Sequence, residues 1–454
     1  MRKHYGMVRR VMACFLVAVL LCLSIPTLAS PADLVVRLLG QGSAPLQMTI
    51  SEPEVRTLAQ FDEKRLSMLN ALIRHLSVTF TLDGSKSETK VSVDRETAFS
   101  VLSDGETKIY SFAPETVVEG ETEASVSSTS LPAFIGEEFS LYMSLPEVLL
   151  PFFEELPSAF EGRMKSEKKE LWFSGYGKSA RRDFMTISAE ETEAAKQAFL
   201  PRTASEQVRN WLSDLRFEGN QKVGLLYDAE GALLRVTWEG RAGRGESLRR
   251  VSLNWRILRA EGLEKDKLSL KTPAVSGNDR DNLELERVFD RAEAEKQTVK
   301  LNLQLEQKAG KDPRSVIRFA ADLSGNAEEL SGKITWEKKQ GSSQENVNIT
   351  PHLQEEAGGH CTGSLEIMKS LDKSERERFL MKVGFQEGET LSWPATERFS
   401  VLQAGEGEER IRKGIARSLL RSLLNLPESD LVYLGSGLPE EEWKKILQIT
   451  GIQE

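Results

Sequence analysis

Apolar and polar residues alternate over much of this chain. From 76 to 93, valine, phenylalanine and leucine alternate with polar residues on both sides of an Asp-Gly pair at 83–84. Successive residues of a strand point to opposite faces of a sheet, and Asp-Gly supplies the positive φ angles of a tight hairpin turn. The pattern predicts an antiparallel hairpin here and a second one across the Asp-Gly pair at 104–105.

The same alternation extends through the region from 216 to 370. Segments such as KVGLLYD, ALLRVTWEG and TVKLNLQLEQ follow one another with gaps of hairpin length. Each segment has one apolar face and one polar face, which is typical of antiparallel sheet with one face on a core and the other in water. We therefore expect this region to be an antiparallel β-meander.

Helical periodicity is confined to shorter stretches. Apolar residues recur every three or four positions over 61–76 and over 408–426, and capping-box sequences at 188–191 and 203–206 predict two further helix starts. The apolar segment LPEVLLPFFEELPSAF contains three prolines, which cannot donate a backbone hydrogen bond inside a helix. It therefore predicts short packed helical turns.

These patterns predict an α+β fold that is mainly antiparallel β, with long meandering curved sheet and a few helices packed on one face. The chain divides into a signal peptide at 1–30, a helix-plus-hairpin region at 31–113, a loop or linker at 114–136, a helical and strand connecting region at 137–215, the antiparallel β-meander at 216–370, and a strand pair with C-terminal helices at 371–454.

The first part, 1–30, has the order of a secretory signal peptide. The basic segment MRKHYGMVRR precedes an apolar run at 11–26, and small residues offer a cleavage site between Ala29 and Ala32. The run is shorter than the roughly twenty apolar residues that span a bilayer. We predict a secreted or extracytoplasmic protein of the cell envelope, the alternative being an uncleaved anchor.

Composition narrows the function further. The chain carries 60 Lys and Arg against 69 Asp and Glu, which gives a net charge of −9. An acidic protein binds nucleic acid poorly, because phosphate binding depends on Lys and Arg. Outside the predicted signal, the one cysteine is Cys361, so no disulfide within the mature chain is expected. We expect its thiol to be buried as a small apolar group.

Motifs for metal or nucleophilic chemistry are missing from the sequence. Beyond the signal the histidines are His75, His352 and His360, and no HExxH or CxxC spacing occurs. GYGKSARR at 175–182 lacks the first glycine of a phosphate-binding loop. We expect no cofactor and no metal. Carboxylate pairs remain available for hydrolysis, but spacing alone cannot show which acids face each other.

The helix predicted at 408–426 is basic on one side. Lys413, Arg417 and Arg421 lie opposite its apolar face, a pattern typical of peripheral contact with an anionic membrane surface. In the alternative interpretation, its apolar residues pack on the sheet while the basic residues stay in water.

The preferred hypothesis is an exported, non-enzymatic protein that binds an unknown ligand or envelope partner through a sheet face or groove. Long antiparallel sheets curved around helices suit apolar ligands, so an apolar groove would support it. One alternative is a carboxylate-dependent hydrolase of cell-wall or other polysaccharide, with two acids facing each other across a cleft. The other is a structural or adhesive surface protein without a pocket.

Overall fold

The fold is known from a computed structural model. It describes residues 46–59, 61–83, 86–103, 108–112, 115–119, 137–160, 162–203, 206–244, 247–273, 280–292, 297–308, 315–325, 329–356, 360–392, 400–402, 414–415, 417–419, 421–422 and 426. The predicted signal peptide lies outside these residues.

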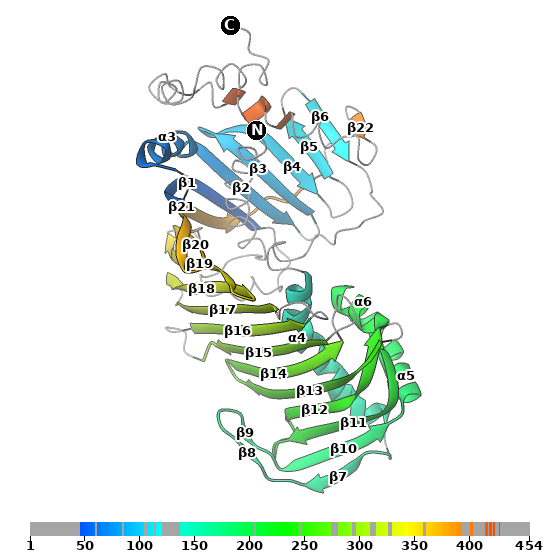
Figure 1. Cartoon of the computed structure of the whole chain (residues 1–454). Helices are drawn as coiled ribbons and strands as arrows, with labels where there is room; N and C mark the ends of the chain where they lie inside the picture. Colours follow the sequence, from blue (N-terminus) through cyan, green and yellow to red (C-terminus); the bar gives the residue numbers. More distant parts are fainter. Residues whose placement is uncertain are drawn as a thin grey trace.

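In the described part of the chain, one sheet contains 20 strands (Figure 1). The helices are α3 (Glu63–Ile73), α4 (Glu137–Ala159), α5 (Ala189–Phe199) and α6 (Glu206–Asp214), with a 3₁₀ turn at Leu200–Arg202. The strands of the sheet are β1 (Leu46–Leu58), β2 (Leu76–Asp83), β3 (Lys86–Val93), β4 (Glu96–Ser103), β5 (Lys108–Phe112), β6 (Glu115–Glu119), β7 (Lys165–Lys168), β10 (Arg181–Ile187), β11 (Arg216–Tyr227), β12 (Leu233–Arg244), β13 (Ser247–Ala260), β14 (Leu263–Pro273), β15 (Arg280–Asp290), β16 (Gln297–Lys308), β17 (Ser315–Gly325), β18 (Glu329–Gln340), β19 (Ser343–Glu356), β20 (His360–Leu371), β21 (Ser374–Glu387) and β22 (Ser400–Leu402). A separate small hairpin is made by β8 (Trp172–Phe173) and β9 (Gly177–Lys178).

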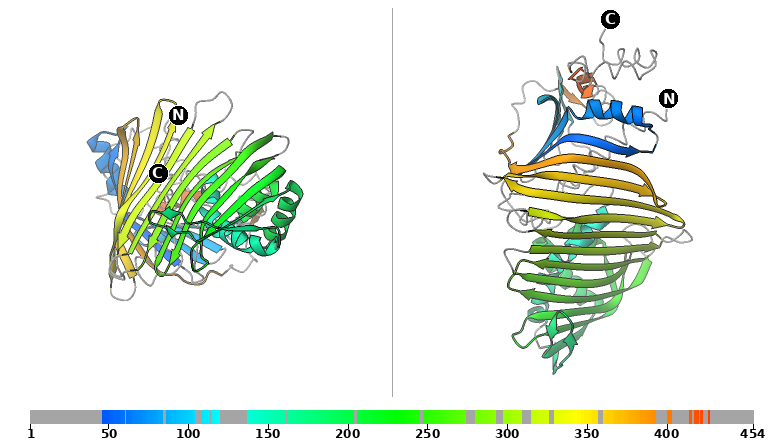
Figure 2. Two further views of the ribbon diagram at one scale, coloured as in Figure 1. Left: turned by 90° about the horizontal axis from the view of Figure 1, so that it is seen from below. Right: turned by 90° about the vertical axis from the view of Figure 1, so that its left-hand side faces the viewer.

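The sheet is a meander that one long-range pairing extends with the N-terminal strands. Strands β10 to β21 each pair antiparallel with the next strand in the chain, so neighbours in sequence are neighbours in space. Strand β1 then pairs with both β21 and β2, which joins the N-terminal strands to the far end of the meander. Figure 2 shows the resulting continuous twisted sheet. The predicted mainly antiparallel β class is confirmed.

Both predicted N-terminal hairpins form. Strand β2 pairs with β3, where Asp83 faces Lys86, and β4 pairs with β5, where Ser103 faces Lys108. The helix predicted over 61–76 is α3, and its apolar residues pack against the adjoining core. Within the loop or linker predicted at 114–136, residues 115–119 instead form β6 and pair with β5. The other residues of that segment lie outside the described part of the chain.

The prediction of short helical turns around the prolines is wrong. Pro146, Pro151 and Pro157 all lie inside α4, which continues for 23 residues. One side of α4 is an apolar stripe that includes Leu145 and Phe153, each 0 % exposed. The free energy of burying this stripe outweighs the local cost of the missing hydrogen bonds, because most helical stability in proteins comes from packing.

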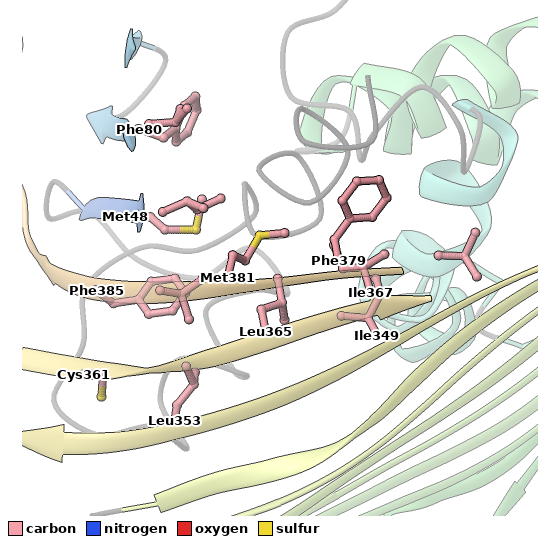
Figure 3. Close-up of a cluster of buried hydrophobic side chains, with 14 of the residues drawn as sticks. Met48, Phe80, Ile349, Leu353, Cys361, Leu365, Ile367, Phe379, Met381 and Phe385 are labelled. Atoms are coloured by element: carbon pink, nitrogen blue, oxygen red, sulfur yellow. The ribbon is translucent and has the colours of Figure 1, made fainter. Parts of the chain in front are cut away.

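Two large apolar clusters are built on the sheet. The first gathers residues from α3, from the N-terminal strands and from β15 to β21, and Figure 3 shows Met48, Phe80, Phe379 and Phe385 within it. Cys361 belongs to this cluster and is 1 % exposed, so its predicted burial is confirmed. The second cluster joins α4, α5 and α6 to apolar residues of β10 to β16.

Alternation gives the strands of the meander two different faces. We call the face that contributes to the apolar clusters the inner face, and the opposite one the outer face. Leu268, Leu285 and Leu303 are in register on β14, β15 and β16 and lie on the inner face. The residues beside them in sequence are polar and lie on the outer face, where the candidate site is found.

Candidate functional site

A groove crosses the outer face of β13 to β17. It has a volume of about 370 Å³ and is partly open to solvent. Its outer-face lining consists of Asn254, Arg256, Lys267, Ser269, Glu284, Glu286, Asn302, Gln304, Arg318 and Ala320. Leu268, Leu285, Leu303 and Phe319 also contribute to its wall. We call it the polar groove after its outer-face residues. A groove that combines amides, hydroxyls and both charges suits a polar ligand.

Strand register arranges these side chains in two straight rows. The first row runs from β13 to β17 through Asn254, Ser269, Glu284, Gln304 and Arg318. Neighbouring members of a row are directly opposite on adjacent strands, so their Cβ atoms lie roughly 5 Å apart. A ligand that lies across the strands therefore meets a polar group at every strand.

The second row begins with cations and ends with a small side chain. It passes through Arg256, Lys267, Glu286, Asn302 and Ala320. The Nζ atom of Lys267 lies 3.5 Å from Oε2 of Glu286, so the positive and negative members partly neutralise each other. Ala320 leaves that end of the row open because its side chain is a single methyl group.

Two arginines stand together where the groove meets β12. Arg235 lies directly opposite Arg256, and its Nε atom donates to Oδ1 of Asn254 at 2.9 Å. Within the described residues, no carboxylate lies within ion-pair distance of either guanidinium. Burial lowers the pKa of Arg235, and the neighbouring charges of Arg256 and Arg182 lower it further. Like charges directly opposite each other destabilise a sheet, so this pair is poised to accept an anion.

An aromatic ring holds both arginines in place. Phe173 lies 5.6 Å from the guanidinium carbon of Arg235 and 5.6 Å from that of Arg256, a cation–π arrangement. Phe173 itself is buried with Tyr176 of the same hairpin and with Leu226 of β11. The β8–β9 hairpin therefore lies over the outer face and fixes the arginine end of the groove.

The structure describes part of the basic C-terminal segment. Arg417 and Arg421 are exposed, while Ile415 and Leu419 pack against the first apolar cluster. The hydroxyl of Ser418, between them, donates to the backbone oxygen of Ala98 on β4. These residues are distant from the polar groove in the fold. Lys413, the third predicted contact residue, lies outside the described residues.

Sequence reasoning missed the groove residues for a definite reason. On each strand they occupy the polar half of the alternation, which is indistinguishable from an ordinary solvated face. The signal that could have found them is the adjacency of Arg235 and Arg256 in a hairpin, since like charges are usually kept apart across strands.

Two further observations concern metal sites and membrane-spanning helices. Among the residues that the structure describes, no group of three or more His, Cys, Asp or Glu side chains is arranged to hold a metal ion. No helix in that same part of the chain is both long enough and apolar enough to cross a membrane.

Comparisons with known proteins give little further guidance. No protein-family model matches the chain, and no curated protein matches it in sequence. A similar solved structure is that of Pseudomonas aeruginosa OccK3 (OpdO), with 7 % sequence identity over 75 % of this chain and 94 % of that one. Its TM-score of 0.26 is too low to carry an argument about fold or function.

Proposed function

We propose that this chain is an exported binding protein whose polar groove holds an acidic polysaccharide, with an anionic group of the ligand at Arg235 and Arg256. Export rests on the basic and apolar pattern of residues 1–30. A sheet with its helices on the inner face would leave the outer face free for such a ligand. This proposal keeps the binding hypothesis and replaces its apolar ligand with a polar one.

The observation that carries the proposal is the arginine pair at the end of the two polar rows. A carboxylate or sulfate there would relieve the repulsion between Arg235 and Arg256 and accept charge-assisted hydrogen bonds. The rows beyond it present amide, hydroxyl and carboxylate groups across five strands, which suits a chain of hydroxyl-bearing units. An open groove accommodates a polymer better than an enclosed cavity does.

Binding of neutral and uronate-containing polysaccharide fragments tests the proposal. We expect Arg256→Gln to weaken binding of acidic fragments about tenfold or more, because a hydrogen bond to a charged group contributes roughly 1.5–3 kcal/mol. The matched control is Arg250→Gln, since Arg250 lies on the same face of β13, has a side chain 72 % exposed, and is outside the groove. Equal effects of the two substitutions would contradict the proposal.

A second pair of variants tests whether the groove is the site. Ala320→Tyr fills the open end of the groove, and we expect it to reduce binding of every fragment that the protein takes. Thr186→Tyr adds the same ring to an exposed outer-face position on β10, away from the groove. Binding that survives Ala320→Tyr unchanged would place the ligand elsewhere.

Hydrolysis is the second candidate function. Glu284 and Glu286 both lie on the outer face of β15 and line the groove, so two carboxylates are available to a glycosidic bond. Release of reducing ends from a polysaccharide by the wild-type protein, abolished in Glu284→Gln, would establish a hydrolase. Binding without release of product supports the non-enzymatic proposal.

A further inference from the structure

The β8–β9 hairpin exposes apolar side chains in a way that the rest of the described chain does not. Trp172 is 75 % exposed and Leu171 is 37 % exposed, and these two are the exposed large apolar residues of the part that the structure describes. They are adjacent in sequence, at the start of a hairpin whose two strands form a sheet separate from the main one (Figure 1). Adjacent exposed apolar side chains, one of them a tryptophan, form a small apolar surface that a contact can bury.

The hairpin is built to hold Trp172 outward. Phe173 points the opposite way and is buried against Leu226, as expected for neighbours on one strand. The amide of Leu171 donates to the hydroxyl of Ser179 at 3.0 Å, and the amide of Ser179 donates back to the oxygen of Leu171 at 2.9 Å. The exposed ring is therefore fixed by the fold rather than carried on a loose end.

Basic residues flank the exposed pair in the sequence. Five lie in the segment from 165 to 181 against two acids, in a chain whose overall charge is −9. The basic residues are Lys165, Lys168, Lys169, Lys178 and Arg181, all of them exposed.

The acids of this segment neutralise only part of that charge. Glu170 pairs with Lys178 and Lys168, whose hydrogen bonds and charges lower its pKa. Within the described residues, Lys165 and Lys169 have no carboxylate within ion-pair distance. Arg181 is paired with Asp183, just beyond the segment. With that acid counted, basic residues still outnumber acids around Trp172 in the sequence.

We infer that this hairpin docks the protein on an anionic lipid surface. Tryptophan favours the boundary between lipid tails and headgroups, and each lysine near an anionic leaflet contributes attraction of its own. The outward tryptophan and the neighbouring leucine suit the apolar side of that boundary, and the exposed lysines near them in the sequence suit the anionic headgroups. The inference is independent of the ligand in the polar groove, because Trp172 and Leu171 do not line the groove.

This location differs from the one predicted from sequence. The described apolar residues of the C-terminal segment are Ile415, Leu419 and Leu426, and all three pack in or against the protein's own core. They are thus occupied within the fold, whereas Trp172 has its ring in solvent. The hairpin offers apolar surface to a membrane without any rearrangement of the fold.

Co-sedimentation of the exported chain with vesicles tests the inference. We expect binding to vesicles of phosphatidylcholine with added phosphatidylglycerol, and much weaker binding to phosphatidylcholine alone. Reversing Lys168 and Lys169 together to Glu should weaken binding to the anionic vesicles by more than about tenfold. The reason is that each lysine near an anionic membrane raises the affinity roughly fivefold. The matched control reverses Lys338 and Lys339, which are also adjacent and exposed on a strand.

Lipids brominated on their acyl chains give a second readout. They quench a tryptophan that enters the membrane, so wild-type emission should fall on binding, and the fall should disappear in Trp172→Phe. Failure of the wild-type chain to bind anionic vesicles would overturn the inference, as would equal losses in the two lysine pairs. Quenching that persists in Trp172→Phe would also overturn it, because another tryptophan would then be the one in the membrane.

Discussion

Asp266 and Arg287 face each other in register on β14 and β15, on the inner side of the sheet and almost completely buried. The Nη2 atom of Arg287 lies 2.8 Å from Oδ2 of Asp266, and the two side chains are 4 % and 0 % exposed. Burial lowers the pKa of Arg287, but the charges of Asp266 and Glu147 outweigh that effect and the pKa is raised overall. Because Glu147 belongs to α4, this cluster ties the helix to the sheet.

Removing the acid of this cluster should strongly destabilise the fold. Asp266 also accepts from Nε1 of Trp255 and from Nη2 of Arg259, each at 2.9 Å. Asp266→Ala therefore removes the acceptor of three donors, of which Trp255 and Arg287 are buried. We expect a loss of about 3–5 kcal/mol in the free energy of unfolding, measured by urea denaturation. Asp322→Ala breaks an exposed pair and serves as the control, with an expected loss of about 1 kcal/mol or less.

Stability should fall at high pH through two buried tyrosines. Burial, together with the charge of Asp183, raises the pKa of Tyr227 to about 12, and burial raises that of Tyr176 to about 12 as well. The unfolded chain loses these protons near pH 10, so unfolding between about pH 10 and 12 releases protons and becomes easier as the pH rises.

Urea denaturation at several pH values across that window measures the effect. Tyr227→Phe should make the pH dependence shallower, and adding Tyr176→Phe should make it shallower again, because each substitution removes one proton from the difference between the two states. An unchanged slope in the double variant would show that these tyrosines do not titrate as expected.

The N-terminal cap of α5 should contribute measurably to stability. The amide of Glu191 donates to the hydroxyl of Ser188 at 3.2 Å, and the amide of Ser188 donates to the Glu191 carboxylate at 2.8 Å. Ser188→Ala should cost about 1 kcal/mol, judged by the urea midpoint. Ser213→Ala removes an exposed hydroxyl from α6 and should cost less than about 0.5 kcal/mol, which sets the background.

Two glycines on adjacent strands should respond oppositely to the same substitution. A methyl group added at Gly363 of β20 would overlap the backbone oxygen of His352, which cannot move without disturbing β19. Gly363→Ala should therefore cost roughly 1–3 kcal/mol. At Gly384 of β21 the nearest atom is 3.9 Å away, so Gly384→Ala should be neutral or slightly stabilising in thermal unfolding. Similar losses for both would refute the steric explanation.

Local structure and the two faces of the sheet follow from residues that are close together in the chain. The alternation across 83–84 predicted the β2–β3 hairpin, and the Ser188 to Glu191 spacing predicted the cap of α5, because both depend on neighbours along the chain. Asp266 is in phase with Leu268 and Leu270 on the same strand, so strand alternation puts it on the apolar face.

Other features depend on tertiary structure: the pairing of distant strands, the polar rows and the continuation of helix α4. The pairing of β1 with β21 joins residues more than three hundred positions apart, as in Leu46 opposite Glu387, and no local pattern encodes it. The polar rows exist only when five strands fall into register, and α4 continues through its prolines only because the sheet buries its apolar stripe. The free energy that stabilises these features comes from burial and strand pairing between segments that are distant in the chain. It therefore depends on the assembled strands.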